Sequence, residues 1–106
     1  MYNDKNYSMF RCAQNNDLLG VIKCVELLKS NINYIHVDAG RTALFWAIFH
    51  YNMDMIDFLL NQGADLRHKD DFKRSYFQLA CDVHNIKAAK FFLKKGFNIN
   101  AVNIYG

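Results

Sequence analysis

Two stretches of this sequence decide its fold: GRTALFWAIFHYNMDMIDFLLNQGADLRHKD (residues 40–70) and KRSYFQLACDVHNIKAAKFFLKKGFNINAVN (residues 73–103). They align without a gap at a constant step of 33 residues, so that Thr42 falls on Ser75. Other aligned pairs are Leu44 and Phe77, Ala47 and Ala80, Leu60 and Leu93, and Gly63 and Gly96. A fixed period of this length is the mark of a stacked-repeat protein, which usually presents an extended surface rather than a catalytic pocket.

The first half of one unit has the pattern of a short helix. Thr42 follows a turn-forming glycine, and its hydroxyl can cap a helix by accepting a hydrogen bond from a free N–H of the first turn. Leu44, Ala47 and Ile48 then recur at i, i+3 and i+4, which places them on one helical face. The pattern breaks at residues 51–52, where we expect a turn.

The second half of the unit predicts a longer helix from about Met53. Met55, Ile56 and Leu59 give it a broad apolar face, and Gly63 is suited to the left-handed conformation that often ends a helix. Residues 64–70 then form an extended loop to the next unit. Helices this short are not stable alone in water, so each unit needs the apolar face of its neighbour.

At this level of detail the unit resembles an ankyrin repeat. The family pattern, roughly Asp-x-x-Gly-x-Thr-Pro-Leu-His-x-Ala followed by Leu-Leu-x-x-Gly-Ala-Asp, is matched by GRTALFWA (residues 40–47) and LLNQGAD (residues 59–65). The next copy matches less well in KRSYFQLA (residues 73–80) and better in FLKKGFNIN (residues 92–100). The resemblance implies an all-α solenoid of stacked helix-turn-helix repeats with loop or β-turn tips.

Departures from the family pattern carry expectations of their own. The family proline is replaced by Ala43 and Tyr76, so the first helix loses a residue with a preset φ. The family histidine, which helps to bind adjacent turns together, is Phe45 or Gln78 here, so we expect looser turns. Lys73 replaces the turn glycine and is strained if the backbone there needs a positive φ.

A degenerate unit precedes these two. SMFRCA (residues 8–13) fits Thr-x-Leu-x-x-Ala, with Ala13 matching Ala47, and LLKSN (residues 27–31) fits Leu-Leu-x-x-Gly, with Asn31 in the glycine place. The spacing predicts two residues inserted between its helices, around positions 17–20. A step of 32 residues matches His36 and Asp38 to His68 and Asp70.

These matches predict one domain, residues 1–106, with approximate repeats 7–39, 40–72 and 73–105. Asn103 to Gly106 reads as the opening of a fourth unit, and the apolar residues 91–93 suit a face that awaits a neighbour. We therefore expect a fragment of a longer repeat protein, or a C-terminal face that contacts another chain; a simply exposed face is the alternative.

Composition excludes several classes of protein. The net charge of +3 is mild and mixed along the chain, which argues against a dedicated nucleic-acid binder, and no apolar run reaches the ~20 residues of a membrane span. The N-terminus has no secretory h-region. Three widely spaced cysteines, all in apolar stretches, predict buried reduced thiols and a cytoplasmic protein, or one in a host cytosol if it is a secreted effector. The abundance of Asn, Lys, Ile, Phe and Tyr suggests an AT-rich genome.

The sequence offers little chemistry. No phosphate loop, zinc-protease helix or nucleophile elbow is present, and no nucleophile–base or acid–base pair can be named, so we expect neither an enzyme nor a cofactor. One weak metal hypothesis places His50 near Cys81, Asp82 and His84 through stacking. A pair of surface histidines, or histidines that contact a partner, are the alternatives, and we assign no metal site.

The resemblance implies recognition of another protein through loop tips and the concave face of the first helices. Trp46 and its aromatic neighbours either pack between units or form a partly exposed patch, where aromatic anchors contribute most to binding. Phe72, at a loop tip, is either solvated or an anchor. The predicted partner-binding residues are Asp38, Arg41, Trp46, Phe49, His50, Asp71, Phe72, Arg74 and Asp82.

Two alternatives come from other functional classes. The repeats could be a targeting appendage of a larger enzyme or channel encoded beyond residue 106, in which case the sequence after Gly106 would depart from the 33-residue period. They could instead be a self-assembling piece that associates through its C-terminal face, which light scattering would reveal.

Overall fold

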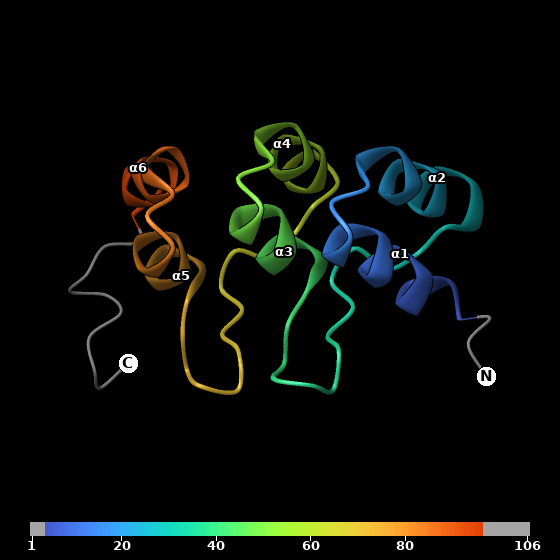
Figure 1. Cartoon of the computed structure of the whole chain (residues 1–106), viewed down its shortest axis with the longest axis horizontal. Coiled ribbons are helices and arrows are strands. Elements are labelled where there is room, and N and C mark those ends of the chain that lie inside the picture. Colours follow the sequence, from blue (N-terminus) through green and yellow to red (C-terminus); the bar gives the residue numbers. More distant parts are fainter. Residues whose placement is uncertain (1–3, 97–106) are drawn as a thin grey trace.

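The computed structural model describes residues 4–96, which form six helices in three pairs (Figure 1). The helices are α1 (Lys5–Gln14), α2 (Leu18–Leu28), α3 (Ala43–Phe49), α4 (Met53–Asn61), α5 (Tyr76–Asp82) and α6 (Ile86–Lys94). The first helices α1, α3 and α5 lie in one row, the second helices form another row, and the loops between pairs project to one side (Figure 1). Every regular element in this part of the chain is helical, which confirms the predicted all-α class.

The same tight turn joins the two helices of every pair. Its middle residue adopts a left-handed φ of 59° to 61°, and the next side chain caps the second helix. The left-handed residues are Asn16, Tyr51 and His84, and the capping residues are Asp17, Asn52 and Asn85. Because this turn is identical in the first pair, no residues are inserted at positions 17–20. The prediction of an insertion there was wrong: α2 itself is longer, with 11 residues against 9 in α4.

The first pair is also in a different register from the one predicted. Asp17 N donates to Cys12 O as Asn52 N donates to Ala47 O, so Cys12, not Ala13, occupies the place of Ala47. Ser8 lies inside α1 rather than at its start, because Asp4 caps the helix by accepting from Asn6 N at 2.8 Å. Alpha-helix α1 therefore begins a full turn earlier than the other first helices.

Helix ends confirm the prediction in two units and contradict it in one. Gly63 and Gly96 follow α4 and α6 with φ of +92° and +95°. After α2, however, the left-handed residue is Lys29 (φ 61°), not Asn31. The prediction matched Leu27 to Leu59, but with the caps Asp17 and Asn52 aligned it is the buried Cys24 that takes the place of Leu59, and Leu27 is 74% exposed. Asn31 instead donates its N–H to the side chain of Asn6 at 2.6 Å, which ties this loop to α1.

The core is one continuous cluster that runs through all three pairs. The predicted apolar faces are buried: Leu44, Ala47 and Ile48 on α3 and Met55, Ile56 and Leu59 on α4 are each at most 2% exposed. The cysteines divide, with Cys24 buried, Cys12 half-buried and Cys81 exposed. Burial of all three thiols was therefore a wrong expectation, since Cys81 lies on the outward side of its short helix.

Side chains bind neighbouring units together. The Thr42 and Tyr76 hydroxyls are 2.6 Å apart, and the buried Asn85 donates through Nδ2 to Ile48 O at 3.1 Å. Burial raises the pKa of Tyr76, against the opposing effect of its hydrogen bond to Thr42. The Tyr51 hydroxyl likewise donates to Val83 O.

Adjacent loop tips are joined without the family histidine. Asp71 N donates to Ala39 O at 3.0 Å, and His68 Nε2 lies 2.7 Å from Gly40 O. Gln78, which stands in one of the histidine places, instead completes a capping box with Ser75. Other residues therefore link adjacent tips, and these hydrogen bonds do not support the expectation of looser turns.

Lys73 occupies the strained turn position foreseen from its alignment with Gly40: the two φ angles are 64° and 65°. We expect Lys73→Gly to raise the free energy of unfolding by about 0.5–1 kcal/mol, since relief of left-handed strain outweighs the added flexibility of the unfolded chain. Lys69→Gly, at a position with ordinary φ, should lower it. Urea denaturation measures both, and loss of stability in Lys73→Gly would contradict the assignment of strain.

None of the six helices combines the length and apolar character needed to span a membrane.

Candidate protein-binding surface

An aromatic cluster covers the exposed side of α3. Trp46 packs edge-on against Phe49 with ring centroids 5.3 Å apart and stacks on His50 at 5.9 Å. Phe45, one residue earlier, is only 6% exposed and contacts both Trp46 and Phe49. Trp46 is half-buried and Phe49 is 44% exposed, so the cluster both packs within the stack and presents a surface. Both alternatives considered for these aromatic residues, packing between units and a partly exposed patch, are therefore present at once.

Two arginines cover the buried ring of this cluster. The Arg41 guanidinium carbon lies 4.6 Å from the centroid of Phe45 and 5.6 Å from that of Trp46. The Arg74 guanidinium, from the next loop, lies 5.7 Å from the same Phe45 ring. Stacking of a planar guanidinium on an aromatic face favours both groups.

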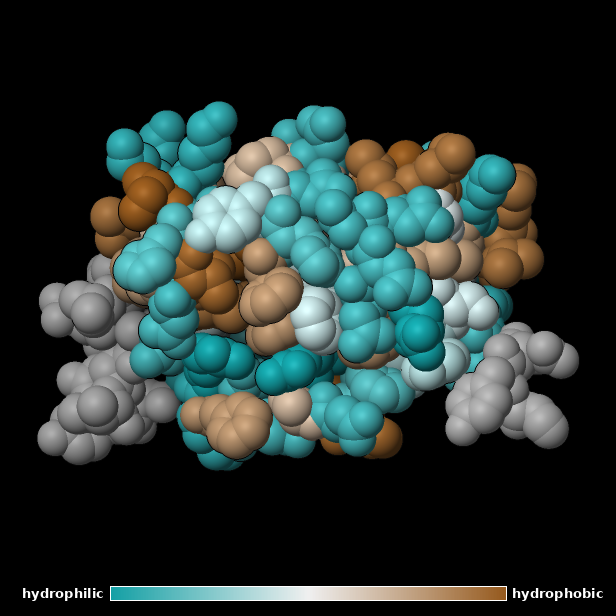
Figure 2. Space-filling view, viewed as in Figure 1, coloured by the Kyte–Doolittle hydropathy of each residue, from teal (hydrophilic) through white to brown (hydrophobic). Residues whose placement is uncertain are grey.

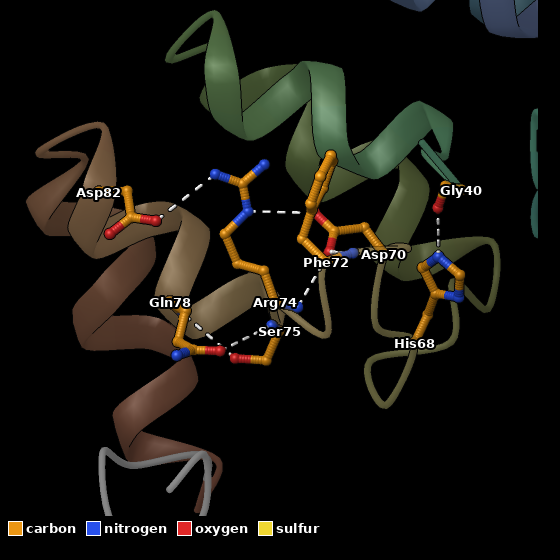
Figure 3. Close-up of polar contacts among 8 residues, drawn as sticks. All are labelled: Gly40, His68, Asp70, Phe72, Arg74, Ser75, Gln78 and Asp82. Atoms are coloured by element: carbon orange, nitrogen blue, oxygen red, sulfur yellow. Dashed lines mark hydrogen bonds and ion pairs between the residues drawn. The ribbon is translucent and has the colours of Figure 1, made fainter. Parts of the chain in front are cut away.

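Arg74 is held in place by two carboxylates (Figure 3). Its Nε donates to Asp70 Oδ2 at 3.1 Å, and its Nη1 lies 3.5 Å from Asp82 Oδ2. Asp70, in turn, is buried and accepts from the backbone N–H groups of Phe72 and Arg74, each at 2.9 Å. The loop tip, the start of α5 and its end at Asp82 are therefore fixed relative to the aromatic cluster.

The match between Asp38 and Asp70 was wrong. Asp70 sits inside its loop, whereas the Asp38 side chain is 89% exposed and its nearest partner is His36 Nε2 at 3.6 Å. The backbone explains the difference: His36 N bonds to Arg41 O in the first loop, but Asp70 N bonds to Arg74 O in the second, which is one residue shorter. Asp38 therefore projects at the tip, and unlike Asp70 it accepts no backbone N–H of its loop among the contacts of the described residues.

Asp71 and Phe72 form the tip of the second loop. Both are exposed, Phe72 by 71%, and the Phe72 side chain stands apart from the α3 cluster, since no ring contact joins it to another described aromatic group. The predicted residues therefore fall into two groups. Arg41, Trp46, Phe49, His50, Arg74 and Asp82 are linked through Phe45, whereas Asp38, Asp71 and Phe72 lie on the tips.

The histidine in the metal hypothesis points to the other neighbour. His50 Nε2 lies 2.8 Å from Gln14 O, so this side chain joins α3 to α1 rather than to Cys81 and His84. Within residues 4–96 no three His, Cys, Asp or Glu side chains are grouped as metal ligands. Partial desolvation, with a contribution from Asp82, raises the pKa of the largely exposed Cys81 thiol, which disfavours the metal-binding thiolate at neutral pH.

The structure adds a cleft that was not predicted. It measures about 320 Å³, lies between α1 and the 36–41 loop, and is lined by Tyr7, Arg11, Gln14, Asp38, Arg41 and Trp46. Sequence reasoning also missed Phe45 as the centre of the surface. The 33-residue alignment does pair Arg41 with Arg74 in the two turns that flank Phe45, and that pairing could have indicated its place. Nothing in the sequence pointed to the α1 residues that line the cleft, because the register of α1 was misassigned.

Comparison with known proteins agrees with this architecture. The family model described as ankyrin repeats (3 copies) matches residues 9–103. A putative ankyrin repeat protein of Borreliella burgdorferi is 35% identical over 63 residues, which cover 59% of this chain and 29% of that relative. The matched region thus spans less than a third of the relative's length.

Proposed function

This chain belongs to the ankyrin-repeat family, and from that premise we propose that it is a non-catalytic scaffold that binds a partner protein through its loop tips and the face of its first helices. Ankyrin repeats are generally protein–protein interaction modules and are typically not catalytic. The observation that carries the proposal is the Arg41–Phe45–Trp46–Phe49 cluster. Aromatic and arginine side chains are the residues enriched among binding hot spots.

Rigidity supports this role for the surface. Arg74 is anchored by Asp70 and Asp82, and His50 is anchored to α1, so these side chains lose little conformational freedom when a partner docks. Phe72 and Asp38 would extend the contact onto the exposed tips. We propose rigid docking, with Trp46, Phe49 and Phe72 as anchors and Arg41, Asp71 and Arg74 at the rim.

The test is affinity capture followed by mass spectrometry. We expect the double variant Arg41→Glu/Phe72→Ala to recover the main partner at least about tenfold less than the natural chain, because it reverses a rim charge and removes an exposed anchor. The matched control, Lys23→Glu/Leu27→Ala, makes the same types of change on α2, where Leu27 is 74% exposed. Unchanged recovery with the first variant would refute this surface.

The second candidate function is a targeting appendage of a larger enzyme or channel. It is favoured by the relative, of which the matched region covers only 29%. Sequence beyond Gly106 that departs from the 33-residue period would support this arrangement, and continued repeats would oppose it. The division into repeats 7–39, 40–72 and 73–105 within one domain is part of the same proposal, as is a location in the cytoplasm or in a host cytosol.

The end of the stack supports a further contact with another chain. Figure 2 shows apolar surface gathered over α2 and over α6, at opposite ends of the molecule. On α6, Ile86 is 60% and Leu93 is 53% exposed, and Leu93 and Phe91 lie between Lys87, Lys90 and Lys94 around a groove of about 610 Å³. If this face alone drove self-association, light scattering would detect oligomers; a monomer would argue against it.

A further inference from the structure

We propose that the cleft between α1 and the 36–41 loop recognises a carboxylate, supplied by an Asp or Glu side chain of the bound partner. This inference rests on the proposed protein-binding function and names the chemistry that one part of the surface selects. It is carried by two unpaired hydrogen-bond donors, one on Arg41 and one on Trp46, and by the charges of Arg11, Arg41 and Asp38; all of these residues line the cleft.

Two residues that line the cleft, Arg41 and Trp46, each carry a hydrogen-bond donor that lacks an acceptor. Arg41 Nε and Trp46 Nε1 are both buried, and neither has a hydrogen-bond partner within the described chain. A buried donor without an acceptor has lost its hydration and gained nothing in return, so it destabilises the free arrangement. The Arg41 guanidinium also makes no ion pair with any carboxylate between residues 4 and 96. These groups are therefore matched to an acceptor that residues 4–96 do not supply.

The charge of the cleft determines the kind of acceptor. Arg11 and Arg41 contribute two positive charges against the single negative charge of Asp38, which already lies 3.6 Å from His36 Nε2. Arg11 is oriented by its own contact, since its Nη1 donates to Tyr7 OH at 3.1 Å. The cleft therefore favours an anion over a neutral amide or carbonyl.

The shape of the donors favours a carboxylate. A guanidinium binds the two oxygens of a carboxylate in one plane, and the Arg41 guanidinium carbon lies 5.6 Å from the centroid of the Trp46 ring, which carries the second donor. Both orphan atoms are covered in the free protein, so the half-buried Arg41 side chain must shift as the ligand enters. That shift breaks no hydrogen bond of Arg41 Nε. Phe49, in contact with Trp46, would pack against the apolar residue next to the acidic one.

Trp46 makes the test direct, because it is the only tryptophan of the chain and gives a single indole N–H signal in a ¹H–¹⁵N spectrum. The probe is the peptide acetyl-Ala-Leu-Ala-Glu-Ala-Leu-Ala-amide, and its counterpart carries Gln in place of Glu. We expect the Glu peptide to shift the indole signal downfield in a saturable way, and to bind at least about tenfold more tightly than the Gln peptide at equal ionic strength.

Variants assign that preference to the cleft. Arg41→Gln should abolish the preference for the Glu peptide, and Arg11→Gln should reduce it, whereas the matched control Lys87→Gln, on α6, should keep it. Spectra of the free variants verify that each is folded. Equal binding of the two peptides, absence of a saturable indole shift, or an undiminished preference in Arg41→Gln would each overturn the inference.

The inference and the proposed function can fail separately. A preference for the Glu peptide, combined with full partner recovery by Arg41→Glu/Phe72→Ala, would leave a carboxylate site on a surface that does not bind the partner. Loss of partner recovery by that variant, without any preference for the Glu peptide, would support the docking surface but reject carboxylate recognition by the cleft.

Discussion

Leu59→Ala should lower the free energy of unfolding by about 2–5 kcal/mol, the range measured when a fully buried leucine is truncated. Leu59 is 0% exposed, on the core side of the middle second helix α4. Removing its isobutyl group loses the free energy of burial and leaves a cavity. The cavity cannot close readily, because Leu59 belongs to a cluster that extends through all three pairs. Urea denaturation followed by circular dichroism measures the loss.

The same substitution at an exposed site provides the control. Leu27, on α2, is 74% exposed, so Leu27→Ala should change the stability by no more than about 0.5 kcal/mol. A comparable loss in both variants would show that Leu59 is not in a shared interior, and the central claim of stacking would fail with it. A broad or two-step transition in Leu59→Ala would instead locate the damage in part of the stack.

Asp70→Ala should destabilise the chain by about 2–4 kcal/mol, although the residue lies in a loop. The carboxylate is 6% exposed and accepts hydrogen bonds from Phe72 N, Arg74 N and Arg74 Nε. Alanine would leave the two backbone donors unsatisfied and would free Arg74 from the ion pair that places it over Phe45. The expected loss of stability stays below the cost of breaking a deeply buried ion pair, because the Arg74 side chain is 26% exposed.

Neighbouring substitutions separate the causes of this loss. Asp71→Ala removes an exposed carboxylate from the same loop and should cost less than about 0.5 kcal/mol. Asp70→Asn keeps one acceptor oxygen for the backbone donors but loses the charge, so it should fall between the two. Denaturation curves rank the three variants, and equal stability of Asp70→Ala and Asp71→Ala would contradict the structural role of Asp70.

The sequence predicted the two regular units well. The cap at Thr42, the break at residues 51–52 and the left-handed Gly63 were all expected from local patterns and are all present. Each of these features depends on side chains within a few positions of one another, so a single unit contains the information that fixes it.

Prediction failed in the first unit, where similar residues fit two registers. Ser8 and Ala13 match the family pattern, yet Asp4 caps α1 and Cys12 takes the place expected for Ala13. The capping geometry of Asp17 shows which register is right. The spacing of apolar residues does not, because it is the same in both registers. The prediction that Asn31 would end α2 failed for the same reason, because it matched Leu27 to Leu59, whereas the Asp17 cap puts Cys24 in that place.

The sequence by itself determined the stack: its period, its short paired helices and their apolar faces follow from residue spacing, which is a local property. Only the tertiary structure decided how the surface is built. Phe45 lies between Arg41 and Arg74, from different units, and His50 reaches back to α1. Contacts of this kind depend on how neighbouring units pack and on which rotamers the packing allows. Neither can be derived from the spacing of residues along the chain.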